Sequence, residues 1–425
     1  MTFRFLHVAD IHLDSPLLNL TRYEDAPTDA FRGATRQALD NLVQLAIEEE
    51  VQFVLIAGDL YDGDCRDFNT PRWLRNRMEE LKAAGARLFI IQGNHDAQSR
   101  MKRAFRLQLP DNVHLFTTNK PETVSIEELQ VAVHGQGFAT ASVTEDLSAD
   151  YPTSRRGWLN IGLLHTNCGA VEGHDNYAPS TIEGLLAKGY DYWALGHIHK
   201  RQLVHESDPW IVYPGNIQGR HINEEGQKGC TLVTVEDGRI SSVAHRELDV
   251  VRWMRCHVDA SGCAEPGEVL TSVVDAIEDS LARAEGRMLA VRLQVTGSTA
   301  AHFHLCSYAA HWQEQLLHDI VDRFDDKVWV EKTEFHTRAA VDVNALTSRD
   351  DALGELLRGI RDSDNIEATL REVRGDLEEI LKILPTDPRS VDARIDLDDP
   401  DQLATVLADV KDILVAQLLQ SGGAP

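Results

Sequence analysis

The sequence has few of the features that mark secreted, membrane-spanning or zinc-knuckle proteins. Only 6 of its 425 residues are cysteine, and no two of them form a Cys-x-x-Cys pair; this argues against a disulfide framework and against a thiolate zinc site. No apolar stretch approaches the roughly 18 residues that a membrane helix requires. The N-terminus reaches Asp10 too early to hold the apolar segment of a signal peptide. We therefore expect a cytoplasmic protein with no membrane span.

Positive charge is also scarce. The chain has 42 Lys and Arg against 68 Asp and Glu, a formal net charge of -26. Nonspecific nucleic-acid binding depends on cationic side chains that neutralise phosphates, so the surface as a whole is unsuited to it. A local site needs only local positive potential. We expect such contacts from Arg103, in the basic run 100–106, and from Arg220 and His221, in a glycine-rich turn after a strand.

The length and the hydrophobic periodicity indicate more than one domain. A chain of 425 residues exceeds one typical core. Apolar runs and amphipathic stretches alternate up to about residue 248, which predicts a mixed α/β domain. From 249 to 342 the order strand, helix, strand, helix, strand predicts a small α/β cap, with a single second helix over 301–322. Residues 343–425 carry mainly helical patterns, and we expect a partner-docking or self-packing segment there.

The strongest positive signal is a set of polar clusters that follow the apolar runs directly. Buried strands are expected at 3–9, 53–57, 88–91, 161–164 and 192–195, and each ends on a metal-ligand type of side chain. We expect these strands to lie side by side in one sheet, which would bring the clusters to one edge. A glycine precedes three of the clusters and would let the backbone turn sharply. The clusters contain Asp10, His12, Asp59, Asn94, His95, Asp96, His165, His197 and His199.

These residues predict a dinuclear metal site. In Asp10-x-His12 and His197-x-His199 the two-residue spacing on an extended segment points both side chains the same way. We expect Asp10, His12 and His199 to hold one ion, Asn94, His165 and His197 to hold the other, and Asp59 to bridge them. Nitrogen and oxygen ligands favour manganese first, with iron or zinc as alternatives. Two cations roughly 3.5 to 4 Å apart can share a hydroxide and stabilise an in-line attack on a phosphoester.

The same clusters, in this order, resemble the calcineurin-like metallophosphoesterase superfamily. Within it, the segments HVADIHLDSPL, AGDLYDGD, YDYWALGHIHKRQ and YPGNIQGRH are similar to bacterial DNA-repair exonucleases of the SbcD and YhaO type, and closest to the YhaO type. The resemblance implies a four-layer αββα sandwich for residues 1–248, a capping domain that restricts which nucleic acid can enter, and manganese-dependent cleavage of DNA. It also implies an SMC-like coiled-coil ATPase as a partner, and leaves a homodimer open.

Carried over to this chain, the resemblance makes His95 the catalytic histidine that assists the leaving oxygen. We expect Asp96, its neighbour, to orient the His95 imidazole. His174, in the glycine-rich loop after His165, is a candidate lining residue of the substrate cleft. The chain departs from the SbcD type at Asp62, where those enzymes often carry a histidine. An aspartate cannot give a phosphate the same cationic contact.

Two other functions stay open at this point. The acidic surface favours a phosphatase or phosphodiesterase that acts on nucleotides or phosphoproteins. Alternatively, the chain acts mainly as a subunit that docks the ATPase through its last 80 or so residues. Turnover of a small phosphodiester compared with an oligonucleotide separates the first alternative from a nuclease, and deletion of the segment tests the second.

Overall fold

The computed structural model describes residues 1–15, 27–62, 69–98, 109–169 and 178–340, together with isolated positions between 348 and 359. The chain divides into two compact units. The first comprises Met1–Arg255, Leu281–Val291 and Asp326–Glu331, and the second comprises Cys256–Ser280, Arg292–Asp325 and the chain from Lys332 onward. The helical segment expected at 343–425 lies outside the described residues apart from those isolated positions. The domain boundaries expected at 248 and 342 stay predictions.

A first sheet of six strands is built around the N-terminal strand. Its order is β12-β11-β1-β2-β3-β4. Strands β1 to β4 run parallel, while β11 and β12 extend the sheet in antiparallel fashion. The bounds are β1 Thr2–Val8, β2 Phe53–Ala57, β3 Arg87–Ile91, β4 Val113–Leu115, β11 Gly229–Glu236 and β12 Arg239–Glu247. Continuous apolar runs form β2 and β3 because both faces of these strands are covered.

A second sheet of six strands has the order β5-β6-β7-β8-β10-β9. Its four central strands are parallel, and the two edge strands pair antiparallel. The bounds are β5 Glu122–Ile126, β6 Val131–Gly135, β7 Leu159–His165, β8 Tyr192–Gly196, β9 Gln202–Glu206 and β10 Trp210–Tyr213. Every residue of β7 and β8 is buried.

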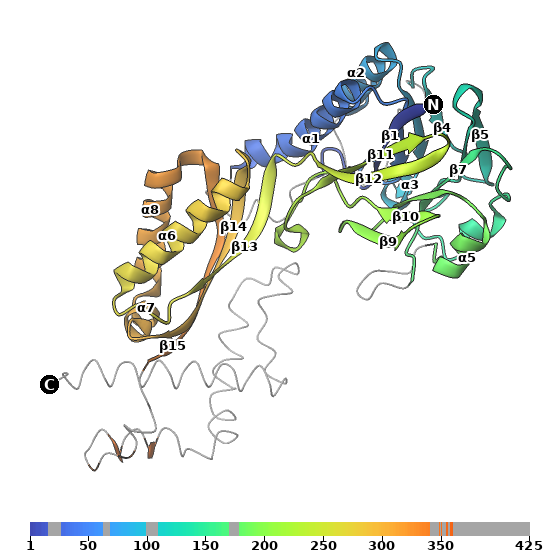
Figure 1. The fold of residues 1–425 in the computed structure, drawn as a ribbon. Coiled ribbons are helices and arrows are strands. Elements are labelled where there is room, and N and C mark those ends of the chain that lie inside the picture. The colour runs from blue at the N-terminus through green and yellow to red at the C-terminus, as the bar shows by residue number, and fades with distance from the viewer. Residues whose placement is uncertain are drawn as a thin grey trace. The chain divides into compact units, whose positions relative to one another are not determined.

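The two sheets face each other between outer helices, which confirms the predicted αββα sandwich. Phe5, Phe53 and Phe89 of the first sheet share a core with Ile161 and Tyr192 of the second. On the outer face of the first sheet pack helices α1 (Thr28–Glu48) and α2 (Thr70–Ala83). On the outer face of the second packs α5 (Ile182–Ala187). Figure 1 shows α1 and α2 above the strands β1, β11 and β12, with α5 on the far side near β9 and β10.

The sandwich corrects one prediction about the site. The five strands that carry the polar clusters do not lie in one sheet, because β1, β2 and β3 belong to the first and β7 and β8 to the second. Each strand is a continuous apolar run, and such a run fits the buried centre of either sheet equally well. The clusters meet because the parallel strands of both sheets end at the same side of the sandwich.

The cap region contains a three-stranded sheet of order β13-β14-β15. Its elements are β13 Val251–Asp259, α6 Pro266–Arg283, β14 Met288–Thr299, α7 His302–Ser307, α8 Ala309–Phe324 and β15 Val328–Ala339. The single helix predicted for 301–322 is wrong. Tyr308 leaves the helical region at φ -125° and ψ 37°, and a new helix, α8, begins at Ala309. Across this break the indole N–H of Trp312 donates to His304 Nδ1 at 3.1 Å.

Shorter elements complete the described chain. They are the helix α3 (Asn94–Gln98) and 3₁₀ helices at Glu127–Leu129, Leu147–Asp150, Ile222–Glu224 and Asp325–Lys327. Among the helices in the described ranges, none combines the length and the apolar character that a bilayer crossing needs.

Candidate metal centre

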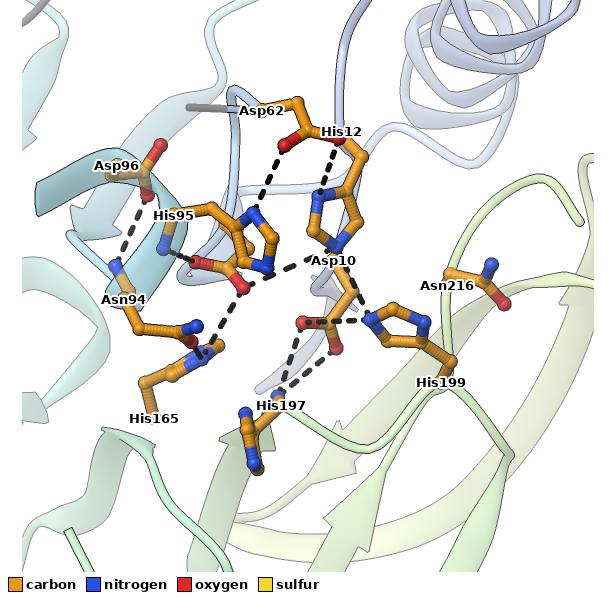
Figure 2. Close-up of polar contacts among 12 residues, drawn as sticks. Asp10, His12, Asp62, Asn94, His95, Asp96, His165, His197, His199 and Asn216 are labelled. Carbon is orange, nitrogen blue, oxygen red and sulfur yellow. Dashed lines mark hydrogen bonds and ion pairs between the residues drawn. The ribbon is translucent and has the colours of Figure 1, made fainter. Parts of the chain in front are cut away.

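Loops after five strands bring the predicted ligands together at one end of the sandwich. Figure 2 shows carboxylate, imidazole and amide groups from distant parts of the chain turned toward one another. Most of these groups are buried, although they are polar. Those that meet here are Asp10, His12, Asp59, Asn94, His95, His165, His197 and His199.

The backbone at these loops is held in an uncommon conformation. Asp10, His12, Asp59 and His197 all have positive φ, at 51°, 45°, 51° and 105°. Non-glycine residues rarely adopt such angles, and each costs about 1 to 3 kcal/mol unless its surroundings enforce it. Here neighbouring strands enforce it, since the N–H groups of Asp10 and His12 donate to the carbonyls of Gly58 and Asp59 at 3.1 and 3.0 Å. The sandwich therefore holds strained backbone where the ligands gather.

The glycines before the clusters are needed mainly for space. Sharp turns were predicted at all three, but only Gly58 has a positive φ, at 92°. A Cβ on Gly93 would lie 2.2 Å from the Oδ1 atom of Asp59, and one on Gly196 would lie 1.9 Å from the carbonyl oxygen of Ala57. Both distances are too short for any side chain. These two glycines let strand ends and ligands approach each other.

The first ligand group contains the residues predicted for one ion. Asp10, His12 and His199 offer ligand atoms that all lie within 4.8 Å of one another. The Nε2 atoms of His12 and His199 are 3.1 Å apart, and Asp10 Oδ1 is 3.9 Å from His199 Nε2. Both oxygens of Asp10 also accept the backbone N–H of His197, at 3.1 and 3.0 Å. The carboxylate is thereby fixed in position.

A second group forms around His165. Its Nδ1 donates to the carbonyl oxygen of Ala57 at 2.9 Å, and since a carbonyl only accepts, Nε2 presents a lone pair. That lone pair faces Asn94 Oδ1 at 2.9 Å and Asp59 Oδ2 at 3.5 Å. The His197 ring packs against the His165 ring with centroids 5.3 Å apart. Of the predicted second set, Asn94 and His165 are thus in direct contact, and the His197 ring lies beside that of His165.

Asp59 lies between the two groups, as a bridging ligand must. Its Oδ2 atom is 3.5 Å from His165 Nε2 in one group and 4.0 Å from His12 Nε2 in the other. Its Oδ1 atom accepts the backbone N–H of His95 at 2.9 Å, which orients the carboxylate. One oxygen therefore faces both groups while the other is held from behind.

The chemistry of these donors fits divalent cations. Lone pairs of His165 Nε2, Asn94 Oδ1 and Asp59 Oδ2 face one another, and acceptors repel unless a cation lies among them. Burial lowers the pKa of His12 well below its usual value and lowers that of His165, which keeps both imidazoles neutral and able to ligate. Burial also raises the pKa of Asp10 and Asp59. Buried carboxylates of this kind are stable as anions beside a metal.

The His95 imidazole is positioned by Asp62 rather than by Asp96, which corrects the prediction. His95 Nδ1 lies 3.0 Å from Asp62 Oδ1, and the His95 side chain is 36% exposed, so a substrate can reach it. The Asp96 carboxylate instead accepts the backbone N–H groups of Leu60, Tyr61 and Gly93 at 3.2, 2.9 and 3.1 Å. Adjacent residues on the short helix α3 point in different directions, so chain neighbours do not pair.

The charges around His95 suit proton donation. Burial alone lowers the pKa of His95, but the hydrogen bond to Asp62 and the charges of Asp59 and Asp62 outweigh this and raise it. Burial raises the pKa of Asp62, yet its hydrogen bonds to His95 and Ser15 and the charge of Arg220 lower it to about 2. Asp62 therefore stays ionised.

Glu224 is a site residue that the sequence did not predict. Its Oε1 atom accepts His199 Nδ1 at 2.6 Å, which leaves Nε2 of that ring free to ligate. Asn216 Nδ2 donates to Glu224 Oε2 at 2.9 Å, and the Glu224 side chain is only 6% exposed. In the sequence it is one of two adjacent acids in a polar turn, a pattern typical of a solvated loop. No signal distinguished it.

The predicted phosphate-binding residues have mixed outcomes. Arg220 reaches the site, but its guanidinium lies against Glu224 and Asp62. His221 is more open, with a 44% exposed side chain and Nε2 3.5 Å from Glu224 Oε1. His174 and Arg103 lie outside the described residues, and their roles stay predictions.

Family models match most of the described chain. The calcineurin-like phosphoesterase model matches residues 3–201, and a model of the middle domain of metallophosphoesterase YhaO matches residues 253–338. The chain is 35% identical over 299 residues to the uncharacterized metallophosphoesterase YhaO of Bacillus subtilis. That match covers 69% of this chain and 72% of the relative.

The chain is also similar to more distant proteins. The chain is 26% identical over 277 residues to the DNA double-strand break repair protein Mre11 of Methanopyrus kandleri, which covers 59% of this chain and 58% of that protein. Among solved structures, a dimetal phosphatase from Danio rerio is 13% identical with a TM-score of 0.37, over 58% of this chain and 97% of that one. On the match to YhaO and to the family model, this chain belongs to the calcineurin-like metallophosphoesterase family and is a metal-dependent phosphoesterase.

Proposed function

We propose that this phosphoesterase is a manganese-dependent DNA nuclease with a dinuclear site. The observation that carries the proposal is the position of Asp59, with one carboxylate oxygen facing ligand groups on both sides. The groups consist of nitrogen and oxygen donors, which suit manganese. The similarity to the Mre11 relative, a protein named for DNA double-strand break repair, supports DNA as the substrate.

The proposed ligands divide into two sets that share one carboxylate. Asp10, His12 and His199 would hold one ion, while Asn94, His165 and His197 would hold the other, with Asp59 shared. When bound, such a pair of ions supplies charge that polarises a phosphoryl oxygen and activates a water molecule as the nucleophile. The strained loops keep the ligands in place before any ion arrives, which reduces the rearrangement that binding requires.

His95 is proposed to assist departure of the leaving oxygen. Its Nδ1–H donates to the ionised Asp62, so its Nε2 is directed away from that carboxylate. The carboxylates of Asp62 and Asp59 raise the pKa of the imidazole, which favours the protonated form that donates a proton as the phosphoester bond breaks. Such assistance contributes typically 10²- to 10⁴-fold to the rate.

A second candidate function is favoured by the net charge of -26. A strongly acidic surface repels a long polyanion, so a small nucleotide or phosphodiester would reach the site more easily than duplex DNA. The same ligands and the same histidine serve both reactions. The two candidates therefore differ in substrate size and not in chemistry.

The experiment compares a labelled oligonucleotide with bis-p-nitrophenyl phosphate, in manganese and in magnesium. We expect the protein with manganese to degrade single- or double-stranded DNA, and Asp59→Asn and His95→Ala to lose that activity. His95→Ala should still bind manganese, which separates loss of the proton donor from loss of the site. Turnover of the small diester with none of any DNA form, and with two ions bound, would establish the second candidate instead.

Partners and location remain predictions from the sequence. The resemblance implies an SMC-like coiled-coil ATPase as a partner and leaves a homodimer open, and the helical patterns of residues 343–425 make that segment the candidate docking site. Co-purification of the full chain, and of a chain that ends at 342, with the candidate ATPase tests the docking. A cytoplasmic site of action is expected for such a complex.

A further inference from the structure

Arg220 lies between two carboxylates at the rim of the metal centre. Its Nη2 atom donates to Glu224 Oε1 at 3.0 Å and its Nε atom to Glu224 Oε2 at 3.4 Å. Its Nη1 atom lies 3.5 Å from Asp62 Oδ2 and 3.4 Å from Ser15 Oγ. The Arg220 side chain is 18% exposed and the Glu224 side chain 6%. The guanidinium therefore has partners on several sides before any substrate binds.

Each of these carboxylates holds a histidine of the proposed mechanism from behind. Asp62 Oδ1 accepts from His95 Nδ1 at 3.0 Å, and Glu224 Oε1 accepts from His199 Nδ1 at 2.6 Å. The contacts form one continuous chain, from His95 through Asp62, Arg220 and Glu224 to His199. The proposed proton donor and one proposed metal ligand are thus connected through a single guanidinium.

The charges favour this arrangement. Burial by itself lowers the pKa of Arg220, but the carboxylates of Glu224 and Asp62 raise it, so the cation is stable here. A buried carboxylate, that of Glu224, and a partly buried one, that of Asp62, leave the cation no surplus positive charge for a phosphate. A planar guanidinium can donate hydrogen bonds to two carboxylates in fixed directions, whereas a lysine ammonium acts as one point charge.

We infer that Arg220 is a positioning residue that sets the orientation of both His95 and His199, and that it does not bind the substrate phosphate. This replaces the phosphate-contacting role expected from the sequence. The inference rests on the proposed function for the roles of the two histidines. It predicts that loss of Arg220 affects the rate and the metal affinity together, and leaves substrate affinity nearly unchanged.

The test uses Arg220→Gln and Arg220→Lys in the full chain, with Arg255→Gln as the matched control. Arg255 pairs with Glu225 Oε1 at 3.0 Å and with Asn223 on the same turn, but with neither histidine-holding carboxylate. We expect Arg220→Gln to lower kcat on bis-p-nitrophenyl phosphate by about 10- to 100-fold and to weaken manganese binding, followed by calorimetry, by about tenfold. KM should change by less than about threefold, and the control should match the wild type.

A second readout requires no metal and no activity. In the metal-free protein, the Nδ1–H proton signals of His95 and His199 report the two carboxylate contacts by NMR. We expect both signals to shift or broaden in Arg220→Gln and to persist in Arg255→Gln. If Arg220→Gln fails to fold, Arg220→Lys decides, because it keeps the charge and should still lower kcat without raising KM.

Several results would overturn the inference. A tenfold or larger rise in KM, with kcat, manganese affinity and both NMR signals unchanged, would return Arg220 to the phosphate-binding role. No change in any readout would remove it from the site. If the wild type binds manganese but hydrolyses no phosphodiester, the proposed function fails while the calorimetry and NMR arms still decide the role of Arg220.

Discussion

The Nδ1 atom of His95 lies 3.0 Å from the Oδ1 atom of Asp62, 33 residues earlier in the chain. Asp62 also accepts the Ser15 hydroxyl at 2.6 Å and lies 3.5 Å from Arg220 Nη1. At this position SbcD-type enzymes often carry a histidine, and the aspartate here takes part in a different contact. It fixes the orientation of the imidazole that the proposed mechanism uses as a proton donor.

The first prediction concerns this pair. Asp62→Asn should lower kcat on a phosphodiester by about 10- to 100-fold, because the neutral amide holds the imidazole less firmly and no longer favours its protonated form. Manganese affinity should stay within about threefold, since Asp62 is not among the proposed ligands. Steady-state kinetics and calorimetry measure the two effects.

Asp96→Asn is the matched control for that prediction. It makes the same change of a carboxylate to an amide, at the residue next to His95 in the chain, but the partners of Asp96 are three backbone N–H groups and no imidazole. We expect it to reduce the free energy of unfolding by about 1 to 3 kcal/mol and to change kcat less than Asp62→Asn does. The opposite order of the two kcat losses would restore Asp96 as the partner of His95.

A second prediction concerns the space that Gly93 leaves for the bridging carboxylate. In Gly93→Ala the new methyl group would meet Asp59 Oδ1 at 2.2 Å, so the carboxylate must move away from both ligand groups. We expect manganese affinity to fall at least tenfold. Gly33→Ala, in helix α1 with no atom within 4 Å of the new Cβ, should bind manganese normally and gain about 0.5 to 1 kcal/mol of stability. Equal affinities in the two variants would contradict the bridging role.

A third prediction links metal binding to stability. Manganese at about 100 times its Kd should stabilise the protein by about 2.7 kcal/mol for each ion bound, and raise the midpoint of thermal unfolding on the order of 5 °C or more. A chelator should reverse the rise. His199→Ala removes a ligand from one group only, so calorimetry should find one ion per chain in place of two. A variant that still binds two ions with unchanged affinity would show that His199 is no ligand.

A fourth prediction tests a buried ion pair away from the metals. Arg252 donates to both oxygens of Asp249 at 2.9 Å, and their side chains are 4% and 0% exposed. Arg252→Met removes one of the cations beside the buried Asp249 carboxylate and leaves Arg287, whose Nε atom lies 3.3 Å from Asp249 Oδ1. Urea denaturation should show a loss of about 3 kcal/mol. The exposed pair of Arg87 and Glu128 provides the control, and Arg87→Gln should cost less than about 1 kcal/mol. Similar losses for both would show that burial does not set the cost.

The strands and most metal-site residues could be predicted from the sequence because each carries a local signal. A continuous apolar run followed by Asp59 or ending in His165 indicates a buried strand with a ligand-type side chain at its end. The predicted strands 53–57 and 192–195 agree closely with β2 and β8. The break at Tyr308 had no such signal, because the sequence around it keeps helical spacing.

Local sequence by itself determined which residues end the strands and which side chains are chemically able to hold a cation. Only the tertiary structure decided that β1 to β3 and β7 to β8 lie in two facing sheets, that Asp62 rather than Asp96 faces His95, and that Glu224 supports His199. The physical reason is that strand formation depends on hydrophobic periodicity within a few residues. Hydrogen bonds between side chains 25 or more residues apart depend on how the sheets and their loops pack, and no pattern along the chain records that packing.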